Sequence, residues 1–396
     1  MRLKTFGPVD DRAAQQIQRC AANDAAYAVL CADHHPGYSQ PIGGAVAYPE
    51  HISPSGVGYD IACGNKAVLT DAVVSDINVP AIMDDISRLI GFGVGRPNPD
   101  PIDHPVLEKI KNAEFRDQRR MIQLASNQLG TVGSGNHYVD IFADEKGRVW
   151  VGVHFGSRGF GHRTASGFLA LAQGKQFDER GKDGEMDSPP VLFSIDSLLG
   201  QDYISAMNLA GEYAYAGRDM VCDKVLEIMG ASALDSIHNH HNFAWREKHF
   251  GEDVWVIRKG CTPAYPGQKG FVGASMGDES VILEGVQSEA SAEGLYSTVH
   301  GAGRVMSRTQ AAGKVRYIKG VPTRLMSGCV DWDAVKQRIA GQGIELRGAG
   351  ADEAPEVYKK LDEVLEHHSG TIRILHRLRP LGVAMAGAEV QDPYKD

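Results

Sequence analysis

The spacing of hydrophobic and polar positions predicts a chain that mixes helices with strands. Apolar residues recur every three to four positions over four segments, which predicts helices at about 11–23, 106–129, 204–229 and 355–367. Alternating apolar residues predict strands at 148–155, 253–260 and 280–285. The helical and extended segments do not alternate regularly, so the pattern favours an α+β fold class over a doubly wound parallel sheet.

Length and composition are those of a globular protein with a substantial core. The chain has 396 residues, of which 42% are hydrophobic and 23% charged. We find no internal repeat and no Ser/Pro-rich linker, so we expect one domain over 1–396 with a short polar tail from about 388. The N-terminus lacks an apolar signal segment, no long apolar run occurs, and the six cysteines follow no framework spacing. These features predict a cytoplasmic protein with reduced thiols and no membrane partner.

Net charge and glycine content restrict how the chain could meet a charged ligand. The formal net charge is −9, so a polyanionic partner would have to meet a local basic site. The 46 glycines cluster in short motifs, which indicates tight turns or backbone that lies close to a ligand. The polar, proline-ended segment 175–190 is expected to be a surface loop.

Candidate metal ligands occur in glycine-rich motifs. Asp60 and Cys63 form a D-x-x-C pair that alone is most simply a buried cysteine beside a capping aspartate. His137, His154 and His241 each stand beside glycine or asparagine at the end of a predicted element. Together these side chains offer mixed N, O and S donors, which suit Mn, Fe, Co or Zn. A thiolate can bridge two ions, and paired ions recur in phosphoryl chemistry.

Other histidines compete for the same role, and spacing does not exclude them. His367 and His368 follow a helical pattern and are expected to be solvated. The open alternatives as ligands are His34, His35, His238, His240 and His249.

Arginines beside glycines are candidate phosphate-binding groups. Arg158 lies in GSRG, Arg258 and Lys259 in RKG, and Arg304 in HGAGR. Guanidinium groups bind phosphate through paired donors, and glycine lets backbone N–H groups reach the same oxygens. GASMGDES, with Ser275, could form another anion-binding turn. Each motif alone is as well explained by an ordinary turn, and no P-loop sequence is present.

His300 is a single imidazole among small residues. It lies in YSTVHGAGRVMSR, and Arg304 follows four positions later. Taken alone, the stretch could be a glycine turn with an incidental histidine. Glycine and alanine neighbours would leave room for a group attached to the ring.

Taken together, the motifs resemble those of one protein family, the RtcB family of RNA ligases. They follow the family's order from about residue 30 to 385, and a match of this length is specific where no single motif would be. The matching motifs are HHPGYSQPIGG, GVGYDIACG, GTVGSGNHYVD, VHFGSRGFGHR, HHN, RKG, SMG, VHGAGRVMSR, DEAPEVYK and LRPLGV.

The resemblance implies a fold, a reaction and cofactors. The expected fold is a single large α+β domain with mixed and antiparallel sheets flanked by helices and a metal cleft built from loops. The expected reaction joins an RNA 2′,3′-cyclic phosphate or 3′-phosphate end to a 5′-hydroxyl end, in RNA repair or tRNA splicing. It uses GTP and two Mn²⁺ ions, although the same ligands would accept other divalent ions. A helper protein is compatible with the sequence and leaves no mark in it.

The resemblance also implies residue roles. Cys63 would bridge the two ions, Asp60 and His137 would complete one ligand set, and His154 and His241 the other. His300 would carry GMP as a phosphoramidate. The expected nucleotide- and phosphate-binding residues are Asn136, Tyr138, Arg158, Asn242, Ser275, Ala302, Arg304 and Tyr358, and the pair expected near the RNA ends is Asp33 and His35.

Two positions expected to contact the nucleotide base depart from the family pattern. Asp140 stands where the family usually has a glutamate, and Met385 where it usually has a lysine that touches the base. Loss of a buried hydrogen-bond partner is worth about 1–3 kcal/mol, enough to relax a preference for GTP. These departures suggest a divergent paralogue. They leave open a metal-dependent phosphodiesterase or phosphatase acting on RNA ends without ligation, or a non-catalytic RNA-end binder.

Overall fold

A five-stranded sheet forms one half of the molecule. The structure is a computed structural model that describes residues 2–22, 24–179, 186–318, 321–388 and 390. The strand order of this sheet is β1–β2–β3–β11–β10, and the strands are antiparallel except for the parallel β1–β2 pair. Helix α1 (Asp11–Ala21) packs on the sheet through a buried face that includes Ile17 and Cys20. The strands are β1 (Arg2–Thr5), β2 (Tyr27–His35), β3 (Ile42–Tyr48), β10 (Asn242–His249) and β11 (Glu252–Lys259).

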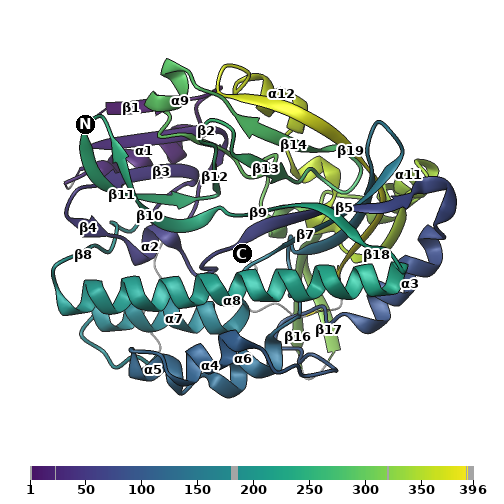
Figure 1. Cartoon of the computed structure of the whole chain (residues 1–396), viewed down its shortest axis with the longest axis horizontal. Helices are drawn as coiled ribbons and strands as arrows, with labels where there is room; N and C mark the ends of the chain where they lie inside the picture. Colours follow the sequence, from purple (N-terminus) through teal and green to yellow (C-terminus); the bar gives the residue numbers. More distant parts are fainter. Residues whose placement is uncertain (1, 23, 180–185, 319–320, 389, 391–396) are drawn as a thin grey trace.

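A larger, curled sheet forms the other half (Figure 1). Its order is β13–β14–β19–β6–β7–β5–β9, with β18 added in parallel to β19. The two end strands of the sheet approach each other, since the Phe271 N–H on β13 donates to Asn239 Oδ1 on β9 at 3.5 Å. The Asn65 side chain on the adjacent strand β5 also donates to the Phe271 carbonyl at 2.9 Å. The strands are β5 (Gly64–Val73), β6 (Tyr138–Ala143), β7 (Arg148–Phe155), β9 (Ala233–His240), β13 (Lys269–Val272), β14 (Ser280–Gly285), β18 (Glu345–Ala349) and β19 (Ile372–Gly387).

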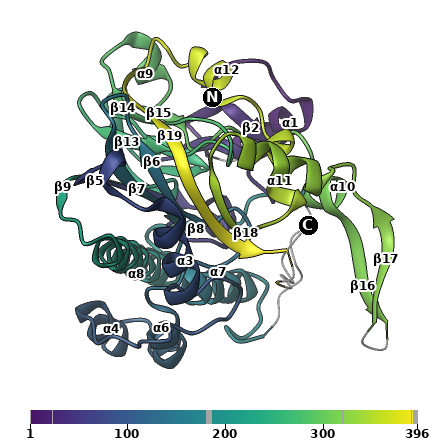
Figure 2. The same ribbon diagram turned by 90° about the vertical axis from the view of Figure 1, so that its right-hand side faces the viewer.

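Helices cover one side of the molecule, below the sheets in Figures 1 and 2. The longest is α8 (Leu198–Met229), which begins after the capping residue Ser197 and ends at Gly230 in the left-handed conformation. The other helices on this side are α3 (Val79–Leu89), α4 (Pro105–Lys111), α5 (Arg116–Arg119), α6 (Ile122–Gln128) and α7 (Arg158–Ala172).

Short elements connect these layers. The β16–β17 hairpin projects from the body of the molecule (Figure 2). Within the described residues, none of the helices is both long and apolar enough to cross a membrane. The connecting elements are β4 (His51–Ile52), α2 (Pro54–Val57), β8 (Phe193–Ser194), β12 (Cys261–Pro263), α9 (Glu289–Glu293), β15 (Ser297–Val299), α10 (Arg308–Ala312), β16 (Gly313–Ile318), β17 (Val321–Ser327), α11 (Trp332–Gly341) and α12 (Leu361–Glu366), with short 3₁₀ turns at Val74–Asp76, Ala351–Glu353 and Pro355–Val357.

The α+β fold class is confirmed, and most predicted elements are present. The predicted helices at 11–23 and 204–229 correspond to α1 and α8. The predicted strands at 148–155, 253–260 and 280–285 correspond to β7, β11 and β14. The described parts of the segment 175–190 form neither helix nor strand, and residues 180–185 lie outside the described chain. The expected polar tail also lies outside it, apart from Ala388 and Val390.

Two helix predictions were wrong in extent. The segment 106–129 is three short helices, α4 to α6. Extended backbone at Phe115 separates α4 from α5 and packs the partly buried Phe115 ring against Phe168 and Phe177. The segment 355–367 is a 3₁₀ turn followed by extended backbone at Tyr358, and only then α12. There Lys359 N–H donates to the Gly303 carbonyl at 2.9 Å, a tertiary bond that takes the place of a helical one.

Candidate metal centre and nucleophile

Strand register gathers the candidate metal ligands at one end of the curled sheet. Strands β6, β7, β5 and β9 lie side by side in that order. Gly64 on β5 pairs with Phe155 on β7 and with His240 on β9. Cys63, His154 and His241 are each one residue away from these three partners, so they are brought to the same level. His137 directly precedes β6, whose first residue, Tyr138, pairs with His154.

A tight turn presents Asp60 and Cys63 together. Gly58 and Ala62 have positive φ, and the Cys63 N–H donates to the Asp60 carbonyl at 3.1 Å. Gly64 has a separate role, in strand packing. A Cβ at Gly64 would lie 2.2 Å from the Asn239 carbonyl oxygen, so glycine lets β9 approach β5 rather than shaping the turn.

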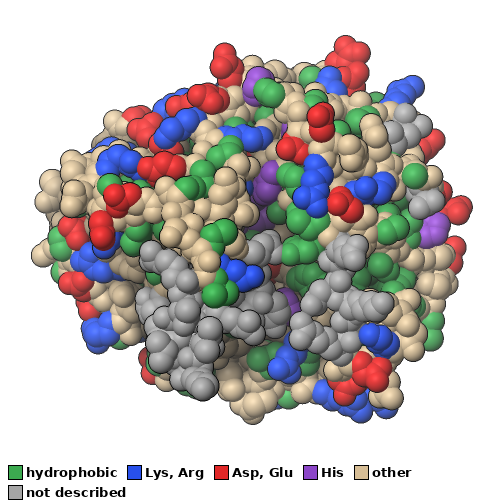
Figure 3. Space-filling view, turned by 180° about the vertical axis from the view of Figure 1, so that it is seen from behind, with side chains coloured by type: hydrophobic (Ala, Val, Ile, Leu, Met, Phe, Trp, Pro, Cys, Tyr) green, Lys and Arg blue, Asp and Glu red, His purple; other side chains and the backbone are tan. Residues whose placement is uncertain are grey.

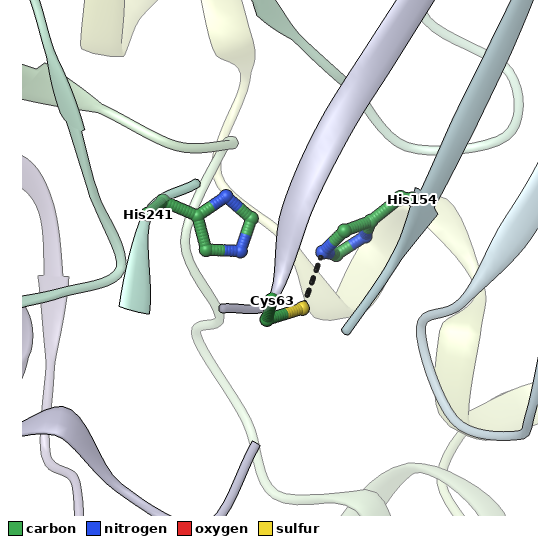
Figure 4. Close-up of side chains that lie close together, drawn as sticks. All are labelled: Cys63, His154 and His241. Atoms are coloured by element: carbon green, nitrogen blue, oxygen red, sulfur yellow. Dashed lines mark hydrogen bonds between the residues drawn. The ribbon is translucent and has the colours of Figure 1, made fainter. Parts of the chain in front are cut away.

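The five side chains form two groups that share Cys63. Asp60, Cys63 and His137 form one, and Cys63, His154 and His241 the other, with the ligand atoms of each within 4.8 Å of one another. Cys63 Sγ lies 3.2 Å from His154 Nε2 and 3.7 Å from His137 Nε2. His137 Nε2 lies 3.1 Å from Asp60 Oδ2. Figure 4 shows the thiol and the His154 and His241 rings facing a common space.

Hydrogen bonds behind the rings fix how two of the imidazoles face this space. His137 Nδ1 lies 3.1 Å from the Val132 carbonyl, and His154 Nδ1 lies 3.1 Å from the Asn136 carbonyl. Each carbonyl accepts the Nδ1 proton and so directs Nε2 toward Cys63, where it could bind an ion through its lone pair. His241 Nδ1 is buried without a hydrogen-bond partner.

The electrostatics suit a cation. Burial lowers the pKa of His154 and His241 well below the ordinary value, so both rings are neutral and can act as ligands. Burial alone would raise the pKa of Asp60, but hydrogen bonding to His137 lowers it to about 2. Burial raises the pKa of the Cys63 thiol, and a bound divalent ion would reverse this by favouring the thiolate. One imidazole–thiolate–carboxylate group and one group of a thiolate with two imidazoles fit borderline divalent ions.

The competing histidines have other partners. His238 and His240 lie on β9 and contact the Arg218 side chain. His249 bonds to Glu247, and His34 accepts from the Asp10 N–H. The expectation that His368 is solvated was wrong: it is fully buried, its Nε2 accepts from the Ala32 N–H, and it stacks on Phe6 at 4.3 Å.

His300 lies next to the metal groups and is held by Asp33. It follows β15, and its ring centroid is 4.9 Å from that of His241. His300 Nδ1 is 2.6 Å from Asp33 Oδ2, and the His300 N–H donates to the same oxygen at 3.1 Å. Burial of Asp33 alone would raise its pKa, but the charge and hydrogen bonds of His300 lower it. His35 lies beside this pair, with Nδ1 3.1 Å from the Asp33 carbonyl.

Arg304 is fixed by a cluster of groups from the DEAPEVYK motif. Its guanidinium donates to the Tyr358 hydroxyl at 3.1 Å and to the Asp352 carbonyl at 2.9 Å, and lies 3.5 Å from a Glu353 carboxylate oxygen. Arg308 pairs with Asp352 and Glu353, and the Tyr358 hydroxyl also bonds to Glu353. Arg308, Asp352 and Glu353 were not predicted from the sequence to have a role, although Arg308 lies in VHGAGRVMSR and the two acidic residues lie in DEAPEVYK.

Arg158, Arg258 and Asn242 differ in how available they are to a ligand. Arg158 has φ +53° at the start of α7, and its side chain donates to Thr131 Oγ1 and the Gly93 carbonyl. Asn242 accepts from the Gly260 N–H at 2.7 Å and donates to the Asp60 carbonyl at 3.3 Å, which makes it a support for the Asp60 turn. Arg258 is fully buried against Glu247, so its guanidinium is not available to phosphate.

The predicted base-side residues lie on neighbouring strands. Met385 on β19 pairs with Tyr138 on β6, and both side chains are buried. The Tyr138 hydroxyl and Asp140 Oδ1 are buried without hydrogen-bond partners. Burial raises the pKa of Asp140 well above its ordinary value. Ser275 donates to Asp278 Oδ2 at 2.7 Å. Ala302 is buried and follows His300 by two positions in the sequence.

A cavity of about 400 Å³ lies beside Tyr358, and it is lined by the loop at Gly277 and Asp278 and by Arg338 and Gln342 at the C-terminal end of α11. Tyr358 connects this cavity to the His300 loop, because its hydroxyl accepts from Arg304. Figure 3 shows histidine side chains in a hollow near the middle of the face opposite that of Figure 1.

Comparison with known proteins supports the resemblance seen in the motifs. A family model described as "tRNA-splicing ligase RtcB" matches residues 16–117 and 103–386. The RNA-splicing ligase RtcB of Escherichia coli K12 is 30% identical over 94% of this chain and 93% of its own length. The tRNA-splicing ligase RtcB of Pyrobaculum aerophilum is 31% identical over 90% and 87%, and that of Mycobacterium tuberculosis, an RNA-splicing ligase, is 30% identical over 88% and 94%. The chain belongs to the RtcB family.

Proposed function

We propose that this chain is an RNA ligase that joins RNA 2′,3′-cyclic phosphate or 3′-phosphate ends to 5′-hydroxyl ends, using GTP and two Mn²⁺ ions. The observation that carries the proposal is the pairing of His300 with buried Asp33 at the edge of two ligand groups that share Cys63. The names of the relatives support the RNA substrate.

The first step uses the orientation of His300. Asp33 Oδ2 accepts the Nδ1 proton of His300, so Nε2 carries the lone pair. Nε2 attacks the α-phosphorus of GTP. A P–N bond forms, the bond from that phosphorus to the bridging oxygen breaks, and pyrophosphate leaves with the electron pair. Asp33 stabilises the positive charge that develops on the ring.

Asp60, Cys63, His137, His154 and His241 would hold the two ions. Bound there, divalent ions neutralise negative charge on the phosphates as pyrophosphate leaves. Arg304, held by Tyr358 and the Asp352 carbonyl, would position phosphate oxygens at the same point.

The later steps transfer the activated group to RNA. An RNA 3′-phosphate oxygen attacks the phosphorus attached to His300, the P–N bond breaks, and an RNA(3′)pp(5′)G end forms. The 5′-hydroxyl of the second RNA then attacks the RNA phosphate, and GMP leaves. A cyclic phosphate must first be opened by water to the 3′-phosphate.

Nucleotide preference is expected to be relaxed. Burial raises the pKa of Asp140 and so favours the protonated carboxyl, which would offer one O–H donor in place of a carboxylate. Met385 offers no donor at all. A base pocket with these two groups discriminates less between purines than one with a carboxylate and a lysine, because fewer buried hydrogen bonds are lost with the wrong base.

Covalent labelling tests the proposal. Metal-loaded protein incubated with Mn²⁺ and α-labelled GTP should acquire acid-labile label, and His300→Ala should acquire none. His367→Ala, which removes an exposed histidine, should label like the wild type. Repeating the assay with ATP, CTP and UTP measures the predicted relaxation.

Two outcomes would contradict ligation. Absence of label from every nucleoside triphosphate would remove the nucleotidylation step. Opening of an RNA cyclic phosphate without joining, at the same rate in His300→Ala, would instead support a metal-dependent phosphodiesterase.

A further inference from the structure

One buried arginine contacts three strands of the metal site at once. Arg218 lies on α8 and is fully buried. Its Nη1 donates to the Ala62 carbonyl at 3.0 Å and to the Phe155 carbonyl at 2.5 Å. Its Nη2 bonds to His240 Nδ1 at 2.9 Å, and its Nε donates to His238 Nε2 at 2.8 Å.

Three of these four acceptors are the chain neighbours of candidate ligands. Ala62 precedes Cys63, Phe155 follows His154, and His240 precedes His241. The three ligands form one of the two groups described above. A single guanidinium is thus bonded next to every member of that group, on β7, β9 and the turn before β5.

Arginine is suited to this position by its shape. The planar guanidinium has five N–H donors in a fixed fork, whereas a lysine ammonium is a single point on a flexible stem. The nearby carboxylate of Asp219 pairs with Lys66 and His238 rather than with Arg218. Tyr215 covers the cluster, with its ring 5.3 Å from the Arg218 guanidinium carbon and 4.0 Å from the His240 ring.

We propose that Arg218 is a positioning residue for the Cys63–His154–His241 metal group. By bonding to Ala62, Phe155 and His240, it fixes the spacing of three strand ends and so the geometry in which the thiolate and two imidazoles meet an ion. The inference rests on the proposed function only in assuming that this group binds a metal. Outer partners of this kind typically change metal affinity by about 10–100-fold when removed.

Cobalt binding tests the inference without relying on ligation. Co²⁺ gives visible d–d bands that report coordination geometry and a near-ultraviolet band for thiolate ligation. Metal-free wild type, Arg218→Met and Arg218→Lys are titrated with Co²⁺, and their thermal unfolding is measured in parallel. Arg258→Met is the matched control, because Arg258 is an equally buried arginine that bonds to Glu247, Ser297 and the Leu295 carbonyl.

The expected result separates positioning from general stability. Arg218→Met weakens Co²⁺ binding by about 10–100-fold and alters the thiolate and d–d bands. Arg218→Lys keeps the charge without the fork and stays weakened. Arg258→Met melts at a lower temperature and retains the wild-type Co²⁺ affinity and spectrum. If Arg218→Met does not fold, His240→Phe removes one of the four acceptors and should weaken binding by a smaller factor.

Two other results have distinct meanings. If wild type binds Co²⁺ through a thiolate and the folded Arg218 or His240 variants bind it equally well with the same bands, the positioning role is wrong while the proposed function stands. If wild type shows no thiolate-ligated Co²⁺, the proposed metal site is wrong, and with it this inference.

Discussion

At the residue scale, the two glycines that flank Ala302 have different roles. Gly303 has φ +79°, and a Cβ there would lie 2.1 Å from the Asp33 carbonyl oxygen. Gly301 has more space, because the nearest atom to a Cβ placed there would be the Gly273 carbonyl oxygen at 3.5 Å. Gly303 therefore lets the His300 loop approach β2, where Asp33 orients the ring, whereas Gly301 leaves open space beside the nucleophile.

Gly303→Ala should lower the free energy of unfolding by about 2 kcal/mol or more, because it adds strain at positive φ and a contact with Asp33. It should also slow labelling of His300, since the contact displaces the residue that orients it. Gly301→Ala is the matched control and should unfold within about 0.5 kcal/mol of wild type. Equal unfolding midpoints for the two variants in urea would show that the close approach to Asp33 is not required.

At the element scale, local pattern predicted structure well where tertiary contacts agree with it. The alternating residues of β7 and β14 and the long helical pattern of α8 were sufficient. The helix predictions failed at Phe115 and at Lys359. At Phe115 the backbone is fixed by packing of the ring against Phe168, and at Lys359 by the hydrogen bond from its N–H to the Gly303 carbonyl. Neither contact is visible in the local sequence, because the partners lie about 50 residues away or more.

The β10–β11 hairpin contains a buried ion pair that joins it to the His300 strand. Glu247 on β10 accepts from Arg258 on β11 at 2.7 and 2.9 Å, and Arg258 also bonds to Ser297 on β15 and to the Leu295 carbonyl. His249 bonds to the same carboxylate. Burial alone would raise the pKa of Glu247, but Arg258 and His249 lower it to about 2.

This pair predicts an acid-sensitive contribution to stability. The folded pKa of Glu247 is below its ordinary value of 4.5, so its stabilisation is complete above about pH 4.5 and is lost as pH falls toward 2. In urea unfolding, wild type should exceed Glu247→Gln by about 3 kcal/mol at pH 6, and the difference should shrink by about 2 kcal/mol at pH 3. Glu252→Gln, an exposed position on the same hairpin, should show no such change. A difference independent of pH would show that Glu247 contributes through packing alone.

At the scale of the whole molecule, the candidate site lies where the two sheets meet. His241 is the single residue between β9 of the curled sheet and β10 of the five-stranded sheet. Asp33 comes from the five-stranded sheet and bonds to His300 across 267 positions of sequence. The motif resemblance predicted five ligand candidates that the fold brings together in two groups, whereas spacing alone had left other histidines open. The Asp33–His300 pair and the contacts of Arg218 arise from packing of distant segments and leave no such mark.

This arrangement predicts that metal and nucleotide protect different sheets from hydrogen exchange. Mn²⁺ alone should slow exchange at the adjoining ends of β5, β7 and β9, because a ligand that binds the folded state raises the free energy of local opening there. Adding GTP should extend protection to the end of β2 and the segment after β15, where Asp33 and His300 lie.

Hydrogen exchange is measured by mass spectrometry on peptic fragments, before and after free GTP is removed. The comparison distinguishes non-covalently bound nucleotide from covalently attached nucleotide. In wild type the protection near His300 should survive removal of GTP, because the nucleotide is attached to the ring. In His300→Ala, Mn²⁺ should still slow exchange at β5, β7 and β9, but the protection near residue 300 should disappear once free GTP is removed. In Cys63→Ser, Mn²⁺ should no longer slow exchange at these strands. Protection of the end of β2 by Mn²⁺ alone would contradict this division, because none of the five candidate metal ligands lies on β2.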